Sequence, residues 1–219
     1  MVSKLHRDEK ASVLVQFTLV FPLLMVVVLG TVDASLMFFN WAGAYKATYA
    51  GARFAAISDP VAGSGLIGAT AGNTTGLSCF DPATGAANAA ANCTSWNVVC
   101  TPSSGTGGSC TGGGTFTNAA FTAILNKMQS YYLSQTLDRR QVIVSYQSTG
   151  LGYVARPGGS PMTVTVSLRC MTQQLFFLGP LMSWAFPALP AACNGIPTAT
   201  GMPMPTFSTT MPSEDLTSN

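Results

Sequence analysis

The chain has 219 residues, of which 47% are hydrophobic and only 8% are charged, with a formal net charge of +2. Its ten Lys and Arg residues are scattered along the sequence, whereas nucleic-acid binding needs a clustered basic face, so that function is excluded. The only histidine, His6, precedes a long apolar run. A Ser-His-Asp or Cys-His catalytic arrangement is therefore excluded from everything that follows the run.

The residues from 11 to 32 include no ionisable side chain. Twenty-two helical residues extend about 33 Å, which matches a hydrocarbon thickness of about 30 Å, so we predict a transmembrane helix here. A buried helix of a soluble protein is one alternative. A cleaved secretory signal is another, with Ala42-Gly43-Ala44 as its small-residue cutting site, although the apolar part of such signals is normally shorter.

Charges that flank this run predict its orientation. Lys4, Arg7 and Lys10 lie just before it, and the nearest basic residues after it are Lys46 and Arg53. We therefore expect residues 1–10 to be a cytoplasmic leader and everything from residue 33 onward to be exported. All six cysteines lie in the exported part, where an even number predicts disulfides; zinc is the alternative, but the sequence has no Cys-x-x-Cys pair. The candidate disulfide cysteines are Cys79, Cys93, Cys100, Cys110, Cys170 and Cys193.

The helical pattern continues beyond the apolar run, over residues 33–58. Apolar residues recur at steps of three or four, while Asn40, Lys46 and Arg53 lie off that stripe, so an amphipathic extension is predicted. We expect one helix from about Ser12 to Ile57, ended by the Asp-Pro pair at 59 and 60. The candidate helix-packing residues are Phe38, Trp41, Tyr45, Tyr49 and Ala52, with Ala56 next in the series.

Small residues also recur between positions 42 and 51 of this extension. They favour either close approach of another backbone or simply the high helix propensity of alanine, and both interpretations stay open.

The remainder is predicted to hold a loop and an α+β domain. Residues 59–115 are rich in Gly, Ser and Thr and contain four cysteines, so we expect a loop stapled by two disulfides, with the third between Cys170 and Cys193. Residues 116–219 predict a second helix over 121–132, capped by Thr117 or Asn118, and an antiparallel sheet. Its strands are predicted at 141–148 and 162–170, joined by a long connection, with an edge strand around 207–211.

The uncharged segment 173–190 is interrupted by glycine and prolines and is too short for a second span. We interpret it as a hydrophobic flap that packs on the sheet, touches the membrane surface or docks a partner.

Residues suited to catalysis or cofactor binding are sparse in the exported part. Its carboxylates, which include Asp33, Asp59 and Asp138, occur mainly where helix capping and solubility explain them. The glycines of 105–114 are not followed by the Lys of a phosphate-binding loop. We expect no enzymatic activity, no cofactor and no metal, and a binding or structural role instead.

The N-terminal region resembles a known family. The stretch KASVLVQFTLVFPLLMVVVLGTVDASLMFF at 10–39, followed by YKATYAGARFAA at 45–56, is similar to TadE-like proteins, the minor pseudopilins of the tight-adherence (Flp-type) pilus apparatus. The resemblance covers about a quarter of the chain and implies a pilin-like α+β fold. The element Phe-Leu-Gly-Pro-Leu at 177–181 is more weakly similar to the exported domain of the family.

The resemblance also implies processing by a prepilin peptidase on the cytoplasmic face. Aligned in this way, the cut falls between Ala11 and Ser12 and places Gln16, followed by Phe17, where the family usually carries Glu. Ala11 replaces the usual Gly, and Gln16 accepts a hydrogen bond but cannot neutralise the amino terminus of a neighbouring subunit. Two alternatives follow: a processed subunit at the pilus tip or base, or an assembly factor that is never cut.

The sequence thus predicts a non-enzymatic pilus-assembly protein, anchored in the bacterial inner membrane by one pass with a periplasmic C-terminal domain. Its expected partners are membrane lipid, other pilin-like or Tad assembly proteins, and the prepilin peptidase. The alternative is an envelope-anchored adhesin or ligand-binding ectodomain on a plain transmembrane anchor.

Overall fold

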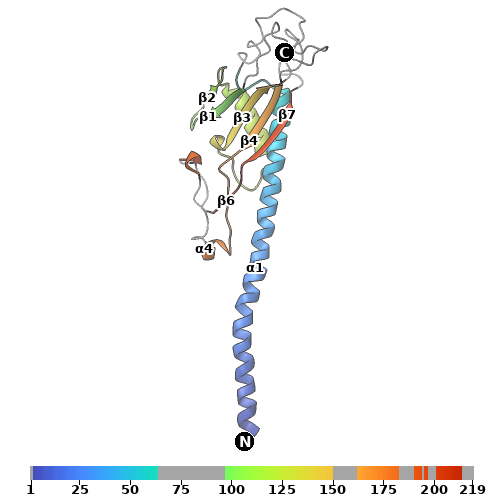
Figure 1. Ribbon diagram of the computed structural model, residues 1–219, viewed down its shortest axis with the longest axis vertical. Helices are drawn as coiled ribbons and strands as arrows, with labels where there is room; N and C mark the ends of the chain where they lie inside the picture. Colours follow the sequence, from blue (N-terminus) through green and yellow to red (C-terminus); the bar gives the residue numbers. More distant parts are fainter. Residues whose placement is uncertain are drawn as a thin grey trace, which may run out of the picture.

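The computed structural model has one long helix that carries a small α+β domain around its C-terminal half (Figure 1). It describes residues 2–63, 97–149, 162–182, 190–193, 195–196 and 201–213.

Helix α1 spans Val2–Ile57, which is 56 residues and therefore about 84 Å in length. It passes through Pro22 without ending. The predicted end at Ile57 is confirmed, and Pro60 follows it in a turn that Gly63 N closes on Pro60 O at 3.0 Å. The predicted start was ten residues too late, because the leader contains helix formers such as Lys, Leu and Glu and neither Gly nor Pro.

The α+β class is confirmed by a five-stranded antiparallel sheet in the order β2-β1-β3-β4-β7. The predicted strands correspond to β3 (Val142–Ser148), β4 (Met162–Leu168) and the edge strand β7 (Phe207–Pro212). Buried and half-buried residues alternate along all seven positions of β4, because one face of the sheet covers the core. Two further strands, β5 (Thr172–Gln173) and β6 (Met202–Pro203), form a separate pair.

Sheet pairing corrects the interpretation of 59–115 as loop. Within it lie β1 (Asn97–Pro102) and β2 (Gly108–Thr111), and β1 pairs with both β2 and β3. Val98 and Cys100 alternate into the core from a short apolar stretch, which the surrounding Gly, Ser and Thr residues caused to be interpreted as loop. The sheet therefore begins at Asn97, upstream of the expected domain start at 116.

Two of the expected disulfides are present. Cys100 and Cys110 stand opposite each other on β1 and β2, with their Cα atoms 4.0 Å apart, and their bond closes that hairpin. Cys170 is bonded to Cys193, which belongs to the short 3-10 helix η4 (Ala191–Cys193). Cys79 and Cys93 lie outside the described residues.

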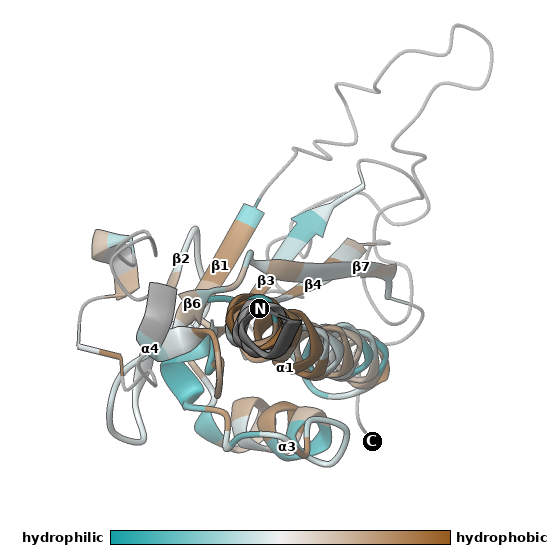
Figure 2. Ribbon diagram, turned by 90° about the horizontal axis from the view of Figure 1, so that it is seen from below, coloured by the Kyte–Doolittle hydropathy of each residue, from teal (hydrophilic) through white to brown (hydrophobic). Residues whose placement is uncertain are grey.

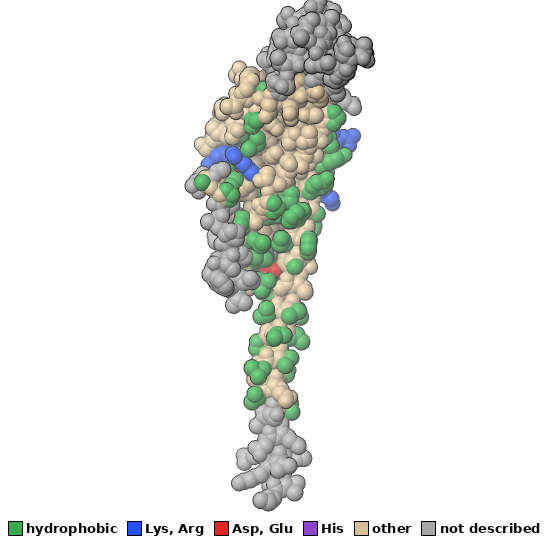
Figure 3. Space-filling view, in the orientation of Figure 1, with side chains coloured by type: hydrophobic (Ala, Val, Ile, Leu, Met, Phe, Trp, Pro, Cys, Tyr) green, Lys and Arg blue, Asp and Glu red, His purple; other side chains and the backbone are tan. Residues whose placement is uncertain are grey.

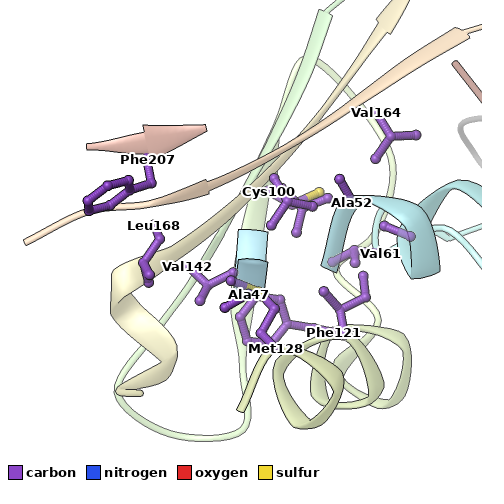
Figure 4. Close-up of a cluster of buried hydrophobic side chains, with 14 of the residues drawn as sticks. Ala47, Ala52, Val61, Cys100, Phe121, Met128, Val142, Val164, Leu168 and Phe207 are labelled. Carbon is purple, nitrogen blue, oxygen red and sulfur yellow. The ribbon is translucent and has the colours of Figure 1, made fainter. Parts of the chain in front are cut away.

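Helix α3 (Asn118–Gln129) and α1 lie on the same face of the sheet (Figure 2). Thr117 is the N-cap residue of α3, as predicted, but its side chain makes no capping hydrogen bond. Figure 4 shows the shared core, in which Phe121 and Met128 of α3 meet Ala47 and Ala52 of α1 and the inward residues of the strands. The remaining short elements are η2 (Arg139–Gln141) and α4 (Gly179–Met182).

Small residues allow α1 to approach its neighbours closely. A Cβ built on Gly51 would lie 2.6 Å from Cγ and 2.9 Å from Sδ of the buried Met128, and 3.4 Å from Val166 of β4. At Gly43 the nearest atom to such a Cβ is a ring carbon of Tyr132 at 3.4 Å. Close approach of a second element therefore explains Gly51, while Gly43 has room for a methyl group.

A buried tyrosine joins the turn after α1 to the sheet. The backbone N–H of Val61 donates to the hydroxyl of Tyr146 on β3, at 2.9 Å. Burial raises the pKa of Tyr146 to about 12, because the phenolate would lose its hydration. The phenol therefore stays protonated in the folded protein over a pH range in which an unfolded chain ionises it.

The two glycines allow one substitution to be tested in two environments. We expect Gly51→Ala to be less stable than Gly43→Ala by about 1–3 kcal/mol, since both gain helix propensity but only the first overpacks the core. Thermal unfolding of the full chain in detergent measures the difference. Equal melting temperatures for the two variants would show that Met128 yields without cost.

Tyr146 predicts a loss of stability at high pH. The folded pKa lies above the unfolded value of about 10, so stability is complete below pH 10 and falls as the pH rises from 10 to 12, by about 3 kcal/mol at most. In Tyr146→Phe this decline should be clearly smaller but not absent, because burial also raises the pKa of Tyr132, which the variant keeps. The variant should be about 1 kcal/mol less stable at pH 7. Tyr45→Phe, at an exposed tyrosine, is the control and should keep the decline. Denaturant unfolding at stepped pH provides the measurement; parallel curves for wild type and Tyr146→Phe would contradict the prediction.

Candidate helix-packing interface

The outer half of α1 has one face that is covered by its own domain. Asp33 and Asn40 are seven residues apart, and from Ala44 onward the buried positions form two adjacent rows in which residues recur every four positions. All of them are small or polar. They place the helix backbone against β4, β7 and α3. The buried residues are Asp33, Asn40, Ala44, Ala47, Thr48, Gly51, Ala52, Ala55 and Ala56.

The aromatic residues predicted to share one packing stripe with Ala52 lie on a different face. Phe38, Tyr45 and Tyr49 are 72%, 56% and 46% exposed, whereas Ala52 is fully buried. Trp41 is 41% exposed and stands at the boundary, where its ring meets Phe207 of β7 edge to face at 5.4 Å. The stripe is therefore divided: its alanine end packs inside the chain, and its aromatic end remains available for a second molecule.

Hydrophobic side chains follow α1 from its described inner part up to the domain (Figure 3). Over the inner part this surface is the candidate membrane span. Among the described residues, α1 is the one helix that is long and apolar enough to cross a membrane. Beyond the span, the apolar surface continues into the exposed aromatic face.

A groove of about 610 Å³ lies between this face and α3. Its walls combine aromatic rings with cationic groups, and no carboxylate of the described residues lines it. A smaller groove adjoins it and shares Lys46 and Tyr131. We call the larger one the α1–α3 groove; its aromatic and charged lining residues are Tyr45, Lys46, Tyr49, Arg53, Lys127 and Tyr131.

The charges of the groove come from both helices. Lys46 and Arg53 are seven residues apart and therefore project from one side of α1, and Lys127 comes from the last turn of α3. Lys127 Nζ lies 5.6 Å from the ring centroid of Tyr131, which holds the ammonium over an aromatic face. The groove thus combines apolar and aromatic side chains with charged groups that are all cationic. Such a lining suits a segment that combines apolar side chains with carboxylates.

Polar ties on the covered face of α1 were missed from the sequence. Asn40, which the pattern placed off the packing stripe, is buried and donates through Nδ2 to the side-chain oxygen of Gln173. Thr209 of β7 bonds the hydroxyl of Thr48 at 3.2 Å. Asp33, interpreted as a capping or solubilising carboxylate, is 1% exposed and accepts three backbone N–H groups from residues 176–178. No local sequence signal identifies these partners, which lie 133 to 161 residues away.

The candidate processing residues all lie within α1. Ala11 and Ser12 are helical, but the structure describes side chains only from Val13 onward. Gln16 is exposed on the helix surface. Phe17 is 64% exposed and stacks on Phe21, with the ring centroids 5.4 Å apart. Both described side chains lie on a part of α1 that no other described element covers.

Comparison with known proteins finds a family match in the N-terminal part of α1 and its outer extension. Residues 11–53 match the family model described as "TadE-like protein". The segment is similar to that family, and we call it the TadE-like segment. The TadE-like segment begins at Ala11, contains the candidate span and ends at Arg53, so it includes most of the exposed aromatic face and the α1 cations of the groove. Neither a curated protein nor a solved structure matches the chain significantly.

Proposed function

We propose that the protein is a non-enzymatic, membrane-anchored assembly protein of a Tad-type (Flp) pilus, and that it associates with a pilin-like partner through α1. The observation that carries this proposal is the division of α1 into a covered small-residue face and an exposed aromatic face, within the TadE-like segment. A plain anchor needs apolar residues inside the bilayer only. Here the apolar surface extends along the helix beyond residue 33, as lateral packing of a neighbouring helix requires.

The flanking charges support a single pass through the bacterial inner membrane, with the N-terminus in the cytoplasm and the domain in the periplasm. In that orientation the α1–α3 groove lies outside the cytoplasm, and the disulfides lie in an oxidising compartment. The groove selects its partner by charge. We infer that Tyr45 and Tyr49 contact apolar side chains of a neighbouring pilin-like or Tad assembly subunit, while Arg53 and Lys127 face carboxylates of that subunit.

Complementation of a deletion strain tests this function. Deleting the gene should abolish surface pili, and the wild-type gene should restore them. Arg53→Glu places a negative charge against the carboxylates of the partner. It should weaken binding to the partner about tenfold or more, which corresponds to about 1.4 kcal/mol, and should reduce piliation about tenfold or more as a result. Pili are counted by electron microscopy, and the protein is quantified in the membrane fraction.

The control matches the change in charge at a distant site. Ser104→Glu together with Thr106→Glu adds two negative charges, as Arg53→Glu does in effect, on the exposed turn between β1 and β2. This double variant should complement fully. Normal piliation in the deletion strain would refute the function, whereas normal piliation with Arg53→Glu would refute only the role given to the groove.

We also propose that a prepilin peptidase cuts between Ala11 and Ser12. The TadE-like match begins at this point, and the cut leaves Gln16 as the fifth residue of the mature chain with an exposed side chain. The free-energy cost of placing Gln within lipid is lower than that of placing Glu there, but Gln does not neutralise a neighbouring ammonium group. Gln16 therefore fits a subunit at the pilus tip or base, where one of the usual neighbours is missing.

Mass spectrometry of the membrane-extracted protein tests the cut. The intact mass should correspond to a chain that begins at Ser12, and it should revert to that of the full leader in a strain without the peptidase. Detection of the leader from Met1 or Val2 in the wild-type strain would establish instead that the protein is an uncut assembly factor.

A further inference from the structure

The segment from Gln174 to Pro180 lies against α1 at the outer end of the apolar run, below the sheet (Figure 1). Its backbone is held by a single side chain. Phe176 N donates to Oδ1 of Asp33 at 3.0 Å, and Phe177 N and Leu178 N donate to Oδ2 at 3.0 and 2.8 Å. Asp33 is the first ionisable residue after the apolar run, and it is buried where it accepts these three bonds.

The contact reaches further inward than Asp33. The Cδ1 atom of Leu178 lies 3.5 Å from the position that a Cβ would take on Gly30. Gly30 is three residues, or about 4.5 Å, closer to the middle of the apolar run. The side chain of Leu178 therefore packs on the last turn of the candidate membrane span, at a distance that would be ordinary van der Waals contact with a methyl group at Gly30.

The neighbouring aromatic side chains are left uncovered at this level. Phe176 is 65% and Phe177 47% exposed, although the backbone that carries them is fixed to α1. Residues 174–180 include no ionisable group, so these two exposed rings lie beside the apolar span with no charged side chain of their own segment between them and it.

A lipid environment explains both the hydrogen-bonded backbone of the segment and the burial of the Asp33 carboxylate. Irregular backbone is tolerated at membrane depth only where its polar groups are satisfied by the protein, and Asp33 satisfies three consecutive N–H groups. A carboxylate at the edge of the hydrocarbon is in turn costly unless it is paired or hydrogen-bonded. The segment and Asp33 thus compensate each other at the depth where neither is well solvated by water.

We propose that residues 175–178 are a second membrane contact, in which Phe176, Phe177 and Leu178 enter the periplasmic leaflet beside α1 and Asp33 positions them. This rests on the proposed placement of α1 across the membrane. The contact gives the molecule a second point of attachment and so fixes the height of the domain above the bilayer and the rotation of α1 within it. The α1–α3 groove is thereby presented at a constant distance above the bilayer.

Spin labelling of the full chain measures the depth of the segment. The label is attached to p-acetylphenylalanine, which avoids new cysteines, and the protein is reconstituted in phosphatidylethanolamine–phosphatidylglycerol vesicles. Oxygen, which concentrates in lipid, and a water-soluble nickel chelate report the environment at Phe176. Leu23, an exposed residue in the middle of the span, is the lipid reference, and Leu133, an apolar residue that is 85% exposed in the domain, is the water reference.

At Phe176 we expect the oxygen-to-nickel accessibility ratio to resemble that at Leu23 and to exceed that at Leu133 at least threefold. A ratio at Phe176 like that at Leu133, with Leu23 in lipid, would overturn this proposal alone. Shielding of Phe176 from both reagents would show that it is covered by protein and would overturn it also. A water-exposed Leu23 would overturn the membrane placement of α1 itself.

Asp33→Asn tests the positioning role. Asn offers one acceptor oxygen to three donors, so the label at Phe176 should become at least threefold more accessible to nickel, while that at Leu23 stays unchanged. Thr48→Ala, which removes a buried tie between α1 and β7, is the control and should leave Phe176 in lipid. Unchanged accessibility of Phe176 in Asp33→Asn would contradict the role given to Asp33.

Discussion

Close contact between α1 and the sheet is the constraint on which the rest of the structure depends. One helix supplies both the candidate membrane span and a full side of the core. The side chains on its covered face therefore have to be small enough for β4 and β7 to approach the helix backbone. Ala47, Gly51 and Ala52 meet that condition. The large side chains of the outer half are consequently displaced to the opposite face, where Tyr45 and Tyr49 are exposed. The candidate interface is therefore a consequence of how the monomer packs.

Polar groups on the covered face add specificity to this contact. Small apolar residues alone permit a helix to slide or rotate against a sheet, because their packing is nearly the same in neighbouring registers. Asp33, Asn40 and Thr48 each have a partner that fits in one register only. These bonds add little net stability, but leaving a buried donor or acceptor unpaired is costly. The direction in which the aromatic face and its groove point is thereby determined.

Helices α1 and α3 and strands β3, β4 and β7 were predictable, because they depend on local patterns. Apolar residues alternate along β3 and β4, and the apolar run of α1 is long and uncharged. Strand β1 was not predictable by composition: Cys100 is a core residue as well as half of a disulfide, and the sequence pattern treats it only as the latter. The face of α1 that the domain itself covers was not identified from the sequence, for a related reason. Hydrophobicity ranks Tyr49 above Gly51 as a core residue, yet the close approach of Met128 makes Gly51 the buried one.

The order of the elements along the chain has a consequence for biogenesis. Thr48 of α1 and its partner Thr209 of β7 are separated by 161 residues, and β4 and β7 together cover the small-residue face of the helix. During synthesis this face emerges early, and the strands that cover it are made late. For that interval the nascent protein has two uncovered helix surfaces, of which the proposed function assigns only the aromatic one to another subunit. Completion of β7 covers the small-residue face, so under the proposed function folding of the domain precedes association.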